Sequence, residues 1–522
     1  MSRRVALCLF LAAAIVGSAC SGSEKPGSAS SGQNAISLNI DFDKRAGSIS
    51  SLIRGLSGEA DSAYIHDAGI SLGSWGGNPS TRYNYKLGNA WNAARDWEYR
   101  NTDYGNVGDS ARNFLTESAR EQVTARMVVP TLGWVARDTN SQHCSFPTPN
   151  GGCGDGAGAT CEKKGPVADP RATSVESTPA SVAAWIKQLV VDQQLPLKFI
   201  AFDNEPELWG VTHYDVHPEC PTFQELLDKY LTYADALRGI APDSQFMGPV
   251  ICCWYTYWRT DNKAPDGDKD FLSWFLSKVS AHDAKSGVRS LDVLDVHYYP
   301  QSDVYNDKAD EQTAARRLRS TRSLYDPTYF DESWIDDRIE FIPRMKRIIA
   351  SSYPGTALAI TEWNFGADTT MNGGLAIADA LGIFGREAVY AAAYWRNPPK
   401  NSPGYYAFKM HGNYDGGGSS FEGQSLRLGG LDRYVDQVSA FAAADDASST
   451  VKVMLLNKQV GEAQPIDITL TGYSASSSAR LFTYSEADLS RIVETELATQ
   501  GDKVHLVLPP YSISLIELKA NR

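Results

Sequence analysis

The middle of the chain alternates short apolar runs with longer segments that carry an apolar stripe at helical spacing. Short runs rich in β-branched residues are typical of buried strands, and the stripes are typical of helices packed on a sheet. The expected strands are Ile70 to Trp75, Met127 to Trp134, Phe199 to Phe202, Gln245 to Ile251, Leu291 to Val296, Ala357 to Glu362 and Val389 to Trp395. The expected helices are Ser181 to Gln193, Thr222 to Arg238, Lys269 to Ser280, Ile335 to Ala350 and Gly374 to Glu387. This alternation predicts an α/β fold, a parallel (β/α)₈ TIM barrel.

After about Gly430 the pattern changes to short strands of period two between turn residues, which predicts an all-β sandwich. Its expected strands are Val451 to Leu456, Ile466 to Leu470, Ala479 to Tyr484, Lys503 to Leu508 and Ser512 to Leu518. The lone alternating strand Ile36 to Phe42 is expected to join the sandwich, so that the barrel is inserted between its two parts. The predicted divisions are 35–55 for the N-terminal strand, 56–430 for the barrel and 431–522 for the sandwich.

The first residues resemble an export signal. Arg3 and Arg4 precede an apolar run that is too short to span a bilayer, which predicts a signal peptide over 1–19. Gly17 to Cys20 is similar to a bacterial lipoprotein box, in which Cys20 would be lipidated, although leucine usually stands where Gly17 is. Ordinary cleavage after Ala19 is the alternative. Residues 20–34 are rich in Ser and Gly and predict a flexible tether. We therefore expect an exported protein, either secreted or a lipoprotein of the bacterial cell surface or outer membrane.

Charge and composition narrow the class of partner. The 522 residues include 49 Lys and Arg against 62 Asp and Glu, a formal net charge of −13. This balance argues against nucleic acid, which calls for a basic groove, and against adhesion to anionic lipid, so a membrane would be reached only through a lipid anchor. The 12 Trp and 25 Tyr supply flat rings of the kind that stack on sugars. A neutral carbohydrate fits best, and we expect a monomer.

Two glutamates directly follow apolar strands. Glu205 precedes Pro206, whose missing N–H ends a strand ladder, and Glu362 ends the run Ala357 to Thr361. Most carboxylates in an acidic chain only solvate the surface. These two are followed by aromatic-rich loops, which is a costly place for a charge that only adds solubility. Because active sites of (β/α)₈ barrels lie at the C-terminal ends of the strands, the pattern predicts a catalytic carboxylate pair.

If Cys20 carries lipid, six cysteines remain in the mature chain: Cys144, Cys153, Cys161, Cys220, Cys252 and Cys253. An even number in an exported protein favours disulfides. We expect two of the first three to pair within their own loop. Cys220 follows one expected strand and Cys252 and Cys253 follow the next, so we expect Cys220 to pair with one of these two. Zinc binding is a poor alternative because no Cys-x-x-Cys or His-Glu-x-x-His pattern occurs, and the metal content stays open.

A set of motifs in fixed order resembles one enzyme family. The motifs are Trp75 to Asn78 with Thr81 to Asn84, Asp203 to Trp209, Asp295 to Pro300, Thr361 to Asn364 and Tyr405 to Gly416. Together they resemble glycoside hydrolase family 44 over about residues 36 to 520. The resemblance implies a barrel with a β-sandwich and a retaining endo-β-1,4-glucanase acting on xyloglucan, cellulose-type and mixed-linkage glucans. It also implies Glu205 as acid/base, Glu362 as nucleophile and no cofactor required for catalysis.

Further residues are predicted to contact the substrate: Trp75, Asn78, Arg82, Asn204, Trp209, His297, Tyr299, Trp363 and Trp395. Asn204 is placed to hydrogen-bond the sugar 2-hydroxyl, and His297 and Tyr299 to orient a glutamate. The tryptophans at 209, 363 and 395 are candidate sugar platforms, with core packing as the plain alternative. Ser74 departs from the family pattern, which leads us to expect Arg there, and Arg82 is the candidate substitute.

Three alternatives stay open. A β-1,4-xylanase or mannanase of a related barrel family would use a similar pair. A glycan-binding surface lipoprotein without turnover is less favoured, because a binding module has no need for two carboxylates close enough to repel. A structural Ca²⁺ is considered at Asp266-x-Asp268-x-Asp270, but Phe271 stands where a calcium loop needs glycine, which favours a solvated acidic turn.

Overall fold

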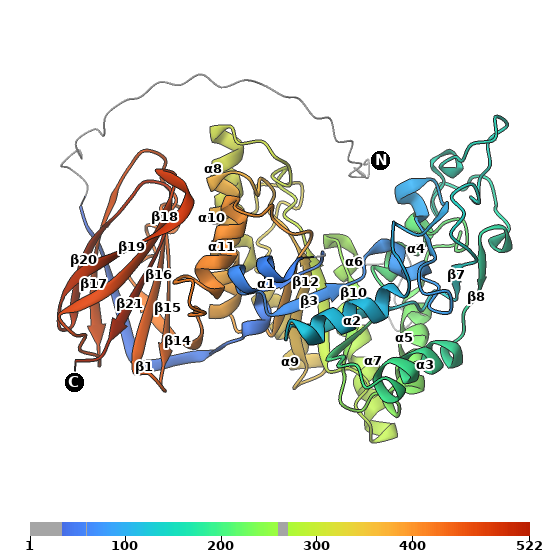
Figure 1. Ribbon diagram of the computed structural model, residues 1–522, viewed down its shortest axis with the longest axis horizontal. Helices are drawn as coiled ribbons and strands as arrows, with labels where there is room; N and C mark the ends of the chain where they lie inside the picture. Colours follow the sequence, from blue (N-terminus) through green and yellow to red (C-terminus); the bar gives the residue numbers. More distant parts are fainter. Residues whose placement is uncertain (1–33, 59, 259–269, 522) are drawn as a thin grey trace. The chain divides into compact units, whose positions relative to one another are not determined.

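The computed structural model describes residues 34–58, 60–258 and 270–521 (Figure 1). The predictions for the signal peptide, for Cys20 and for most of the tether fall on residues 1–33, outside the described residues. Asp266 and Asp268 of the considered calcium turn also lie outside them. In the part of the chain that is described, no helix is long and apolar enough to cross a membrane.

The predicted parallel barrel is confirmed. Within the described residues, eight parallel strands close in the order β10-β11-β12-β13-β2-β3-β6-β9. They are β2 (Gly55–Leu56), β3 (Leu72–Trp75), β6 (Thr124–Val129), β9 (Phe199–Phe202), β10 (Gln245–Ile251), β11 (Val293–Tyr298), β12 (Ala357–Trp363) and β13 (Ala391–Tyr394). The longer helices between and after them are α1 (Ser62–Ala68), α2 (Ser110–Arg120), α3 (Pro179–Lys187), α5 (Phe223–Arg238), α7 (Phe271–Ser286), α8 (Glu311–Ser320), α9 (Phe341–Ser352) and α10 (Met371–Arg386).

Shorter elements lie in the loops between these strands and helices. They are the two-stranded antiparallel sheets of β4 (Trp91–Asn92) with β5 (Asn101–Thr102) and of β7 (Trp134–Ala136) with β8 (Ser174–Glu176), and the short helices α4 (Trp209–Thr212) and α6 (Trp254–Trp258). The ten-residue helix α11 (Pro403–Gly412) follows β13.

The strands of the barrel are buried on both faces. In β9, Phe199 and Ala201 pack inside the barrel, while Ile200 and Phe202 pack against the helices. Such strands read as continuous apolar runs because neither face meets water. This explains why the apolar runs predicted the barrel strands.

The second domain is a closed β sheet. Nine strands of the described chain form it in the order β1-β14-β15-β16-β21-β18-β19-β20-β17. Their bounds are β1 (Ile36–Ile49), β14 (Gly423–Gly429), β15 (Val438–Asp445), β16 (Thr450–Asn457), β17 (Gln464–Thr471), β18 (Ser478–Ser485), β19 (Asp488–Gln500), β20 (Lys503–Leu508) and β21 (Ser512–Lys519). The strand β1 pairs with β14 and β17, so the predicted β domain of C-terminal strands plus an N-terminal strand is confirmed. Since β14 precedes residue 431, we propose that the domain boundary lies before it.

The helix α10 is almost wholly buried and contacts both domains. Its residues from Met371 to Gly385 are all buried, and it contacts β1, β15, β16 and β21 of the second domain. A helix that is apolar over most of its surface is a buried helix, and its buried polar side chains Asn372 and Asp379 accept hydrogen bonds from neighbouring residues. At Gly382 an added Cβ would come within 2.3 Å of the Phe441 ring, so glycine permits the close approach of the β domain.

Candidate active site

The turn that ends β9 is held by a buried aspartate. Asp203 accepts hydrogen bonds from the N–H groups of Thr131 (2.7 Å) and Leu132 (3.1 Å) and from the Thr81 hydroxyl. These partners follow β6 and β3, so one carboxylate ties three neighbouring strand ends together. Glu205 takes a left-handed conformation (φ 46°), and its N–H donates to the Val250 carbonyl of β10 at 2.9 Å. The Glu205 side chain is left 20% exposed.

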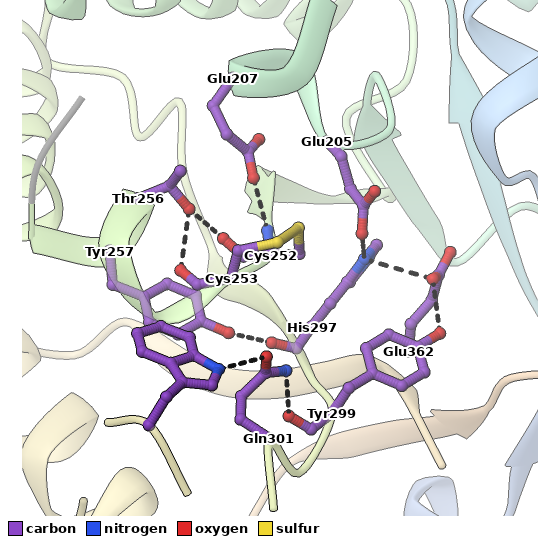
Figure 2. Close-up of a disulfide and its surroundings, with 11 residues drawn as sticks. Glu205, Glu207, Cys252, Cys253, Thr256, Tyr257, His297, Tyr299, Gln301 and Glu362 are labelled. Carbon is purple, nitrogen blue, oxygen red and sulfur yellow. Dashed lines mark hydrogen bonds and ion pairs between the residues drawn. A yellow bond between two sulfur atoms is a disulfide. The ribbon is translucent and has the colours of Figure 1, made fainter. Parts of the chain in front are cut away.

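A β-bulge brings Glu362 opposite His297. In the β11–β12 pairing Val296 lies opposite Ile360, but the next pair is His297 with Glu362, so Thr361 is the extra residue. Bulges of this kind re-aim side chains beside active sites. His297 Nδ1 lies 2.9 Å from Glu205 Oε1 and 3.4 Å from Glu362 Oε2 (Figure 2). Carboxylate oxygens of both glutamates and a His297 ring nitrogen all lie within 4.8 Å of one another.

Two further polar groups hold Glu362. The Tyr299 hydroxyl donates to Glu362 Oε2 at 3.0 Å. The Asn204 amide is oriented so that its nitrogen and its oxygen both have hydrogen-bond partners. In this orientation Nδ2 donates to Glu362 Oε1 at 3.2 Å and the oxygen accepts the Asn78 N–H at 3.3 Å. Both oxygens of Glu362 are therefore directed by neighbouring side chains.

Burial and charge set the protonation of this cluster. Burial is the largest cause that raises the pKa of Glu362 to about 7, opposed by His297 and reinforced by the charge of Glu205. Burial alone would lower the pKa of His297, yet that pKa is raised because Glu362 and Glu205 favour the imidazolium. Burial and the charge of Glu362 raise the pKa of Tyr299 far above neutrality, so Tyr299 stays a donor.

Glu207 and a disulfide lie beside this cluster (Figure 2). Cys252 and Cys253 are joined to each other directly after β10. Glu207 Oε1 accepts the Cys252 N–H at 2.7 Å, and burial is the main cause that raises the pKa of Glu207 well above its usual value. The Tyr257 hydroxyl donates to the His297 carbonyl. The turn after β10 is thus tied to β11 and to the segment that carries Glu205.

Glu205, His297 and Glu362 are also, among the described residues, the group whose donor atoms could surround a metal ion. A metal would need a deprotonated ring nitrogen. Nδ1 also lies 2.9 Å from Glu205 Oε1, a hydrogen-bonding distance at which one of the two groups carries the proton between them. The arrangement therefore fits two carboxyl groups that share protons with an imidazole, which is the equipment of acid–base chemistry.

Known proteins share this fold. The family model for glycoside hydrolase family 44 matches residues 90–302. The crystal structure of CelM2, a bifunctional glucanase-xylanase from a metagenome library, is 32% identical, with a TM-score of 0.87 over 94% of this chain and 100% of that chain. The chain belongs to glycoside hydrolase family 44.

Two further relatives of this family 44 protein are known. Endoglucanase A of Paenibacillus lautus is 29% identical over 498 residues, which are 85% of this chain and 68% of that one. A family 44 xyloglucanase of Paenibacillus polymyxa, also solved with xyloglucan, is 26% identical, with a TM-score of 0.81 over 94% of this chain and 100% of that chain. As a member of family 44, the protein is a glycoside hydrolase.

Five residues predicted from the sequence of this glycoside hydrolase meet in one cluster. They are Asn204, Glu205, His297, Tyr299 and Glu362. Asn78 joins them through its N–H. Trp395 is half-buried and packs on Gly77, where an added Cβ would come within 2.7 Å of the ring. Glycine at 77 therefore permits the close approach of the Trp395 ring to this backbone.

Two predicted sugar platforms are wrong, because these rings belong to the core. Trp209 and Trp363 are both 0% exposed. The Trp209 indole donates to Asp203 at 3.4 Å, which makes it a support of the β9 turn. Trp363 packs against Phe384 and Tyr394 in the layer between barrel and helices. A sugar ring has no access to either face.

The predictions for Trp75 and Arg82 are also wrong. Leu72 and Ser74 of β3 face the barrel interior, so Trp75 faces the helices, where it contacts Tyr83 and donates to Ser110 of α2 at 3.2 Å. Arg82 is fully buried in an ion pair with Asp215 at 3.0 Å. Its guanidinium is engaged by Asp215 and Ser174, so it does not replace the arginine expected at position 74.

The barrel interior beside Ser74 holds a different arginine. Arg126 of β6 lies opposite Ser74 in the strand register and donates to its hydroxyl at 2.9 Å. The other Arg126 nitrogen donates to Asp295 at 2.8 Å, and Asp295 accepts the Thr361 hydroxyl at 2.7 Å. Thr361 adjoins Glu362, whose pKa the Arg126 charge helps to lower. The signal that could have revealed Arg126 is a charge at the start of the apolar run from Met127.

The disulfides correct one prediction. Cys144 pairs with Cys153, as expected for two cysteines of one loop. Cys220 pairs with Cys161, so its predicted bond to Cys252 or Cys253 is wrong. The reason is the path of the long loop after β6: the Cys161 N–H donates to the Gly210 carbonyl at 2.7 Å, and an added Cβ at Gly210 would come within 2.8 Å of the Cys161 sulfur. This loop lies against the segment that follows Glu205.

Sequence reasoning missed a third carboxyl group near the pair. Asp96, in the 3-10 helix η3 (Ala94–Trp97), accepts a hydrogen bond from the Asn78 amide at 2.9 Å. Its pKa is raised, mainly by burial and also by the charge of Glu205. Asp96 stands in a loop without apolar periodicity or motif, so nothing in the sequence around it marks it.

Proposed function

We propose that this protein is a retaining endo-β-1,4-glucanase that works by double displacement, with Glu362 as nucleophile and Glu205 as acid/base. The supporting observation is that oxygens of the two carboxyl groups lie within 4.8 Å. Retaining glycosidases hold these groups about 5 to 5.5 Å apart, whereas inverting enzymes leave about 6.5 to 9.5 Å for a water molecule. The two carboxyl groups lie too close together for a water molecule to fit between the sugar and a catalytic base, as an inverting enzyme would need.

In the first step Glu362 attacks the anomeric carbon while Glu205 protonates the leaving oxygen. Tyr299 and Asn204 hold the Glu362 oxygens in position, and the Asn204 amide is placed to meet the sugar 2-hydroxyl. In the second step Glu205 takes a proton from water, which hydrolyses the glycosyl–enzyme bond. His297 contacts both carboxylates and can stabilise whichever one carries the negative charge.

The substrate we propose is a neutral β-1,4-glucan backbone, with xyloglucan, cellulose-type and mixed-linkage glucans as the members to compare. The relatives from Paenibacillus are an endoglucanase and a xyloglucanase. Because CelM2 is a glucanase-xylanase, β-1,4-xylan is the second candidate. Asn78, Asp96 and the half-buried Trp395 offer hydrogen-bonding groups and a ring around the pair.

The test is a proton NMR time course on a soluble glucan. New reducing ends should appear first as the β-anomer, and initial α-anomer would overturn the retaining assignment. Initial rates on xyloglucan, carboxymethylcellulose, mixed-linkage glucan, xylan and glucomannan, at equal backbone concentration, then rank the substrates. A dominant rate on xylan or glucomannan would show that the protein is a xylanase or a mannanase and would overturn the glucanase assignment.

We also propose export with lipid attached at Cys20, from the sequence of the first 34 residues. Cys20→Ala should move the protein from the membrane fraction to the soluble fraction with unchanged specific activity. A wild-type protein that is wholly soluble, with an unmodified cysteine at its N-terminus, would exclude lipidation.

A further inference from the structure

Arg317 of α8 is a buried cation whose hydrogen bonds go to uncharged oxygens. Its side chain is 0% exposed. Nε donates to the Phe365 carbonyl at 2.9 Å, and Nη2 donates to the carbonyls of Val304 at 2.8 Å and Asn306 at 2.9 Å. Nη1 donates to Asn372 Oδ1 at 2.6 Å. Because burying a charge is costly, this placement indicates that the geometry of the carbonyls it binds matters to the protein.

The carbonyls that Arg317 binds belong to two loops at the C-terminal ends of barrel strands. Val304 and Asn306 lie in the loop after β11, and Phe365 lies in the loop after β12. The two loops approach closely at Gly366, where an added Cβ would come within 2.7 Å of the Asn306 backbone. Carbonyl oxygens gathered at one place repel one another unless a donor lies between them. Arg317 therefore sets the spacing of the two loops.

Each loop adjoins one partner of a catalytic contact. Glu362 is the last residue but one of β12, and Tyr299 directly follows β11. The Tyr299 hydroxyl donates to Glu362 Oε2 at 3.0 Å (Figure 2). Tyr305, within the segment 304–306 that Arg317 binds, packs its ring edge-on against the Tyr299 ring with centroids 5.3 Å apart. A shift of the loop after β11 relative to β12 would therefore reach the Tyr299–Glu362 hydrogen bond.

Arg317 is itself held in one orientation. Asn372 of α10, which accepts from Arg317, donates from Nδ2 to the Ala314 carbonyl of α8 and to the Tyr511 hydroxyl of the β domain, both at 2.9 Å. These bonds fix the amide, and the fixed amide oxygen fixes the guanidinium plane. A rigid planar group can bind carbonyls of two loops at once, which the single ammonium of a lysine does less well.

We propose that Arg317 is a positioning residue for the hydrolysis, which fixes the loop after β11 against β12 so that the Tyr299 hydroxyl meets Glu362. Arg317 acts through the loops and takes no part in the bonds that break or form. The proposal goes beyond the proposed function and rests on it for the role of Glu362 as nucleophile.

This role has a consequence for pH dependence that a merely structural role lacks. Burial is the largest cause that raises the pKa of Glu362, and the charge of Glu205 adds to it, whereas His297, the Tyr299 hydrogen bond and Arg126 lower it. Loosening the Tyr299 hydrogen bond removes one group that favours the carboxylate, so the pKa of Glu362 should rise further. Since the nucleophile must be ionised, the acidic limb of the kcat/KM profile should move to higher pH.

The experiment compares Arg317→Lys, Tyr299→Phe and the double variant on a soluble glucan. Arg317→Lys should lower kcat about tenfold with KM nearly unchanged and should move the acidic limb to higher pH. Tyr299→Phe should cause the same changes more strongly. In the double variant kcat should lie within about twofold of Tyr299→Phe alone, because the hydroxyl through which Arg317 acts is already absent. An unchanged kcat in Arg317→Lys, or losses that multiply in the double variant, would overturn the proposal.

A second variant keeps the test independent of how well Arg317→Lys folds. Gly366→Ala leaves Arg317 in place, but its Cβ would push the loop after β11 away from the loop after β12. It should therefore lower kcat and shift the acidic limb in the same direction. Arg319→Lys is the matched control on α8, because Arg319 pairs with Glu332 at 2.7 Å and is partly exposed, and it should keep the wild-type kcat. A wild-type profile for Gly366→Ala, or an equal loss in Arg319→Lys, would count against the positioning role.

Failure of the proposed function is distinguishable from failure of this inference. A carbon-13 NMR titration of the Glu362 carboxyl needs no turnover, and Glu362→Gln identifies its signal. A raised carboxyl pKa in Arg317→Lys would support the positioning role even if Glu362→Ala kept activity on an activated aryl cellobioside, which would end the nucleophile assignment. An unchanged carboxyl pKa would refute the positioning role and leave the enzyme assignment intact.

Discussion

The barrel mouth and the surface of α10 that meets the β domain both bury charge, but in opposite ways. Beside α10, Lys458 lies 2.7 Å from Asp379, each side chain 2% exposed, and the Thr321 hydroxyl also donates to Asp379. At the mouth, Glu205 and Glu362 face each other across a single imidazole. Only the first arrangement matches each charge with its opposite.

The difference separates groups that hold the fold from groups that do chemistry. In a buried ion pair the attraction between the two charges offsets part of their desolvation, and removing one member is costly. At the mouth, burial is the main cause that raises the pKa of Glu362 to about 7, and the charge of Glu205 adds to it. Such a site lowers stability in exchange for reactivity, a common trade in enzymes.

The largest effect is expected from removing either carboxyl group at the mouth. Glu362→Ala should lower kcat on every substrate by about 10⁴-fold or more, because no group can then attack the anomeric carbon. Glu205→Ala should cripple hydrolysis of glucans but spare aryl glycosides whose leaving group needs no proton, and added azide should yield a β-glycosyl azide.

Kinetics on glucan and on an activated aryl cellobioside check this prediction. Glu207→Gln is the matched control, since it changes a buried glutamate of the same turn that does not contact His297, and it should keep most activity. Substantial activity of Glu362→Ala on the aryl substrate would refute the nucleophile assignment.

Substitutions in the Lys458–Asp379 ion pair beside α10 should change the stability of the fold and not the catalytic rate. Lys458→Met leaves Asp379 buried without its cation and should destabilise the fold by about 3 to 5 kcal/mol in urea denaturation, with kcat of the folded enzyme unchanged. The double variant Lys458→Met/Asp379→Leu should recover most of this loss. Removing the exposed pair Arg491–Asp488 should cost under about 1 kcal/mol. An equal cost at both places would show that burial does not set the difference.

Neutralising Glu362 should stabilise the protein at high pH. The folded state holds the Glu362 proton up to about pH 7, whereas the unfolded chain releases it near 4.5, so ionisation between these pH values costs the folded state stability. Glu362→Gln removes that cost, worth up to roughly 3 kcal/mol above pH 7 and fading toward pH 4.5.

Melting temperatures from pH 4.5 to 8 measure this effect. Glu225→Gln is the control, because a hydrogen bond from His217 lowers the pKa of Glu225 and its neutralisation should give no gain at high pH. A gain for Glu362→Gln that does not depend on pH would contradict the prediction.

The smallest effect is expected from Arg126, a paired charge inside the mouth. Arg126→Lys cannot donate to Ser74 and Asp295 from a rigid planar group, so Asp295 and Thr361 should hold Glu362 less firmly. We expect kcat to fall about tenfold, or about 1.4 kcal/mol, with a small change in melting temperature.

The double variant Ser74→Arg/Arg126→Ser places a guanidinium on β3 instead of β6. It should recover part of the kcat that Arg126→Lys loses. Arg238→Lys is the control, since Arg238 pairs with Asp292 just before β11, at the other end of the strands, and should leave kcat unchanged. An equal loss in both lysine variants would remove any special role for Arg126.

The sequence by itself determined the barrel, the β domain and the two strand-end glutamates. The reason is that these features are written in neighbouring residues: a strand buried on both faces reads as an apolar run, as in Phe199 to Phe202, and a proline at 206 marks where it ends. Motifs such as Asp203 to Trp209 then led to the family. The clustering of Asn204, His297 and Tyr299 around the pair also followed, because parallel strand ends meet at one end of a barrel.

Only the tertiary structure decided where the remaining side chains point and what they meet. A bulge at Thr361 turns Glu362 toward His297. Side chains alternate between the two faces of β3, so Trp75 faces the helices and not the barrel interior. Cys220 forms a disulfide with Cys161, Arg126 donates to Ser74, and Tyr255 stacks on Trp334, in each case across a long stretch of chain. These contacts depend on strand register and loop path, which arise from packing between distant segments and leave no mark in the local pattern of residues.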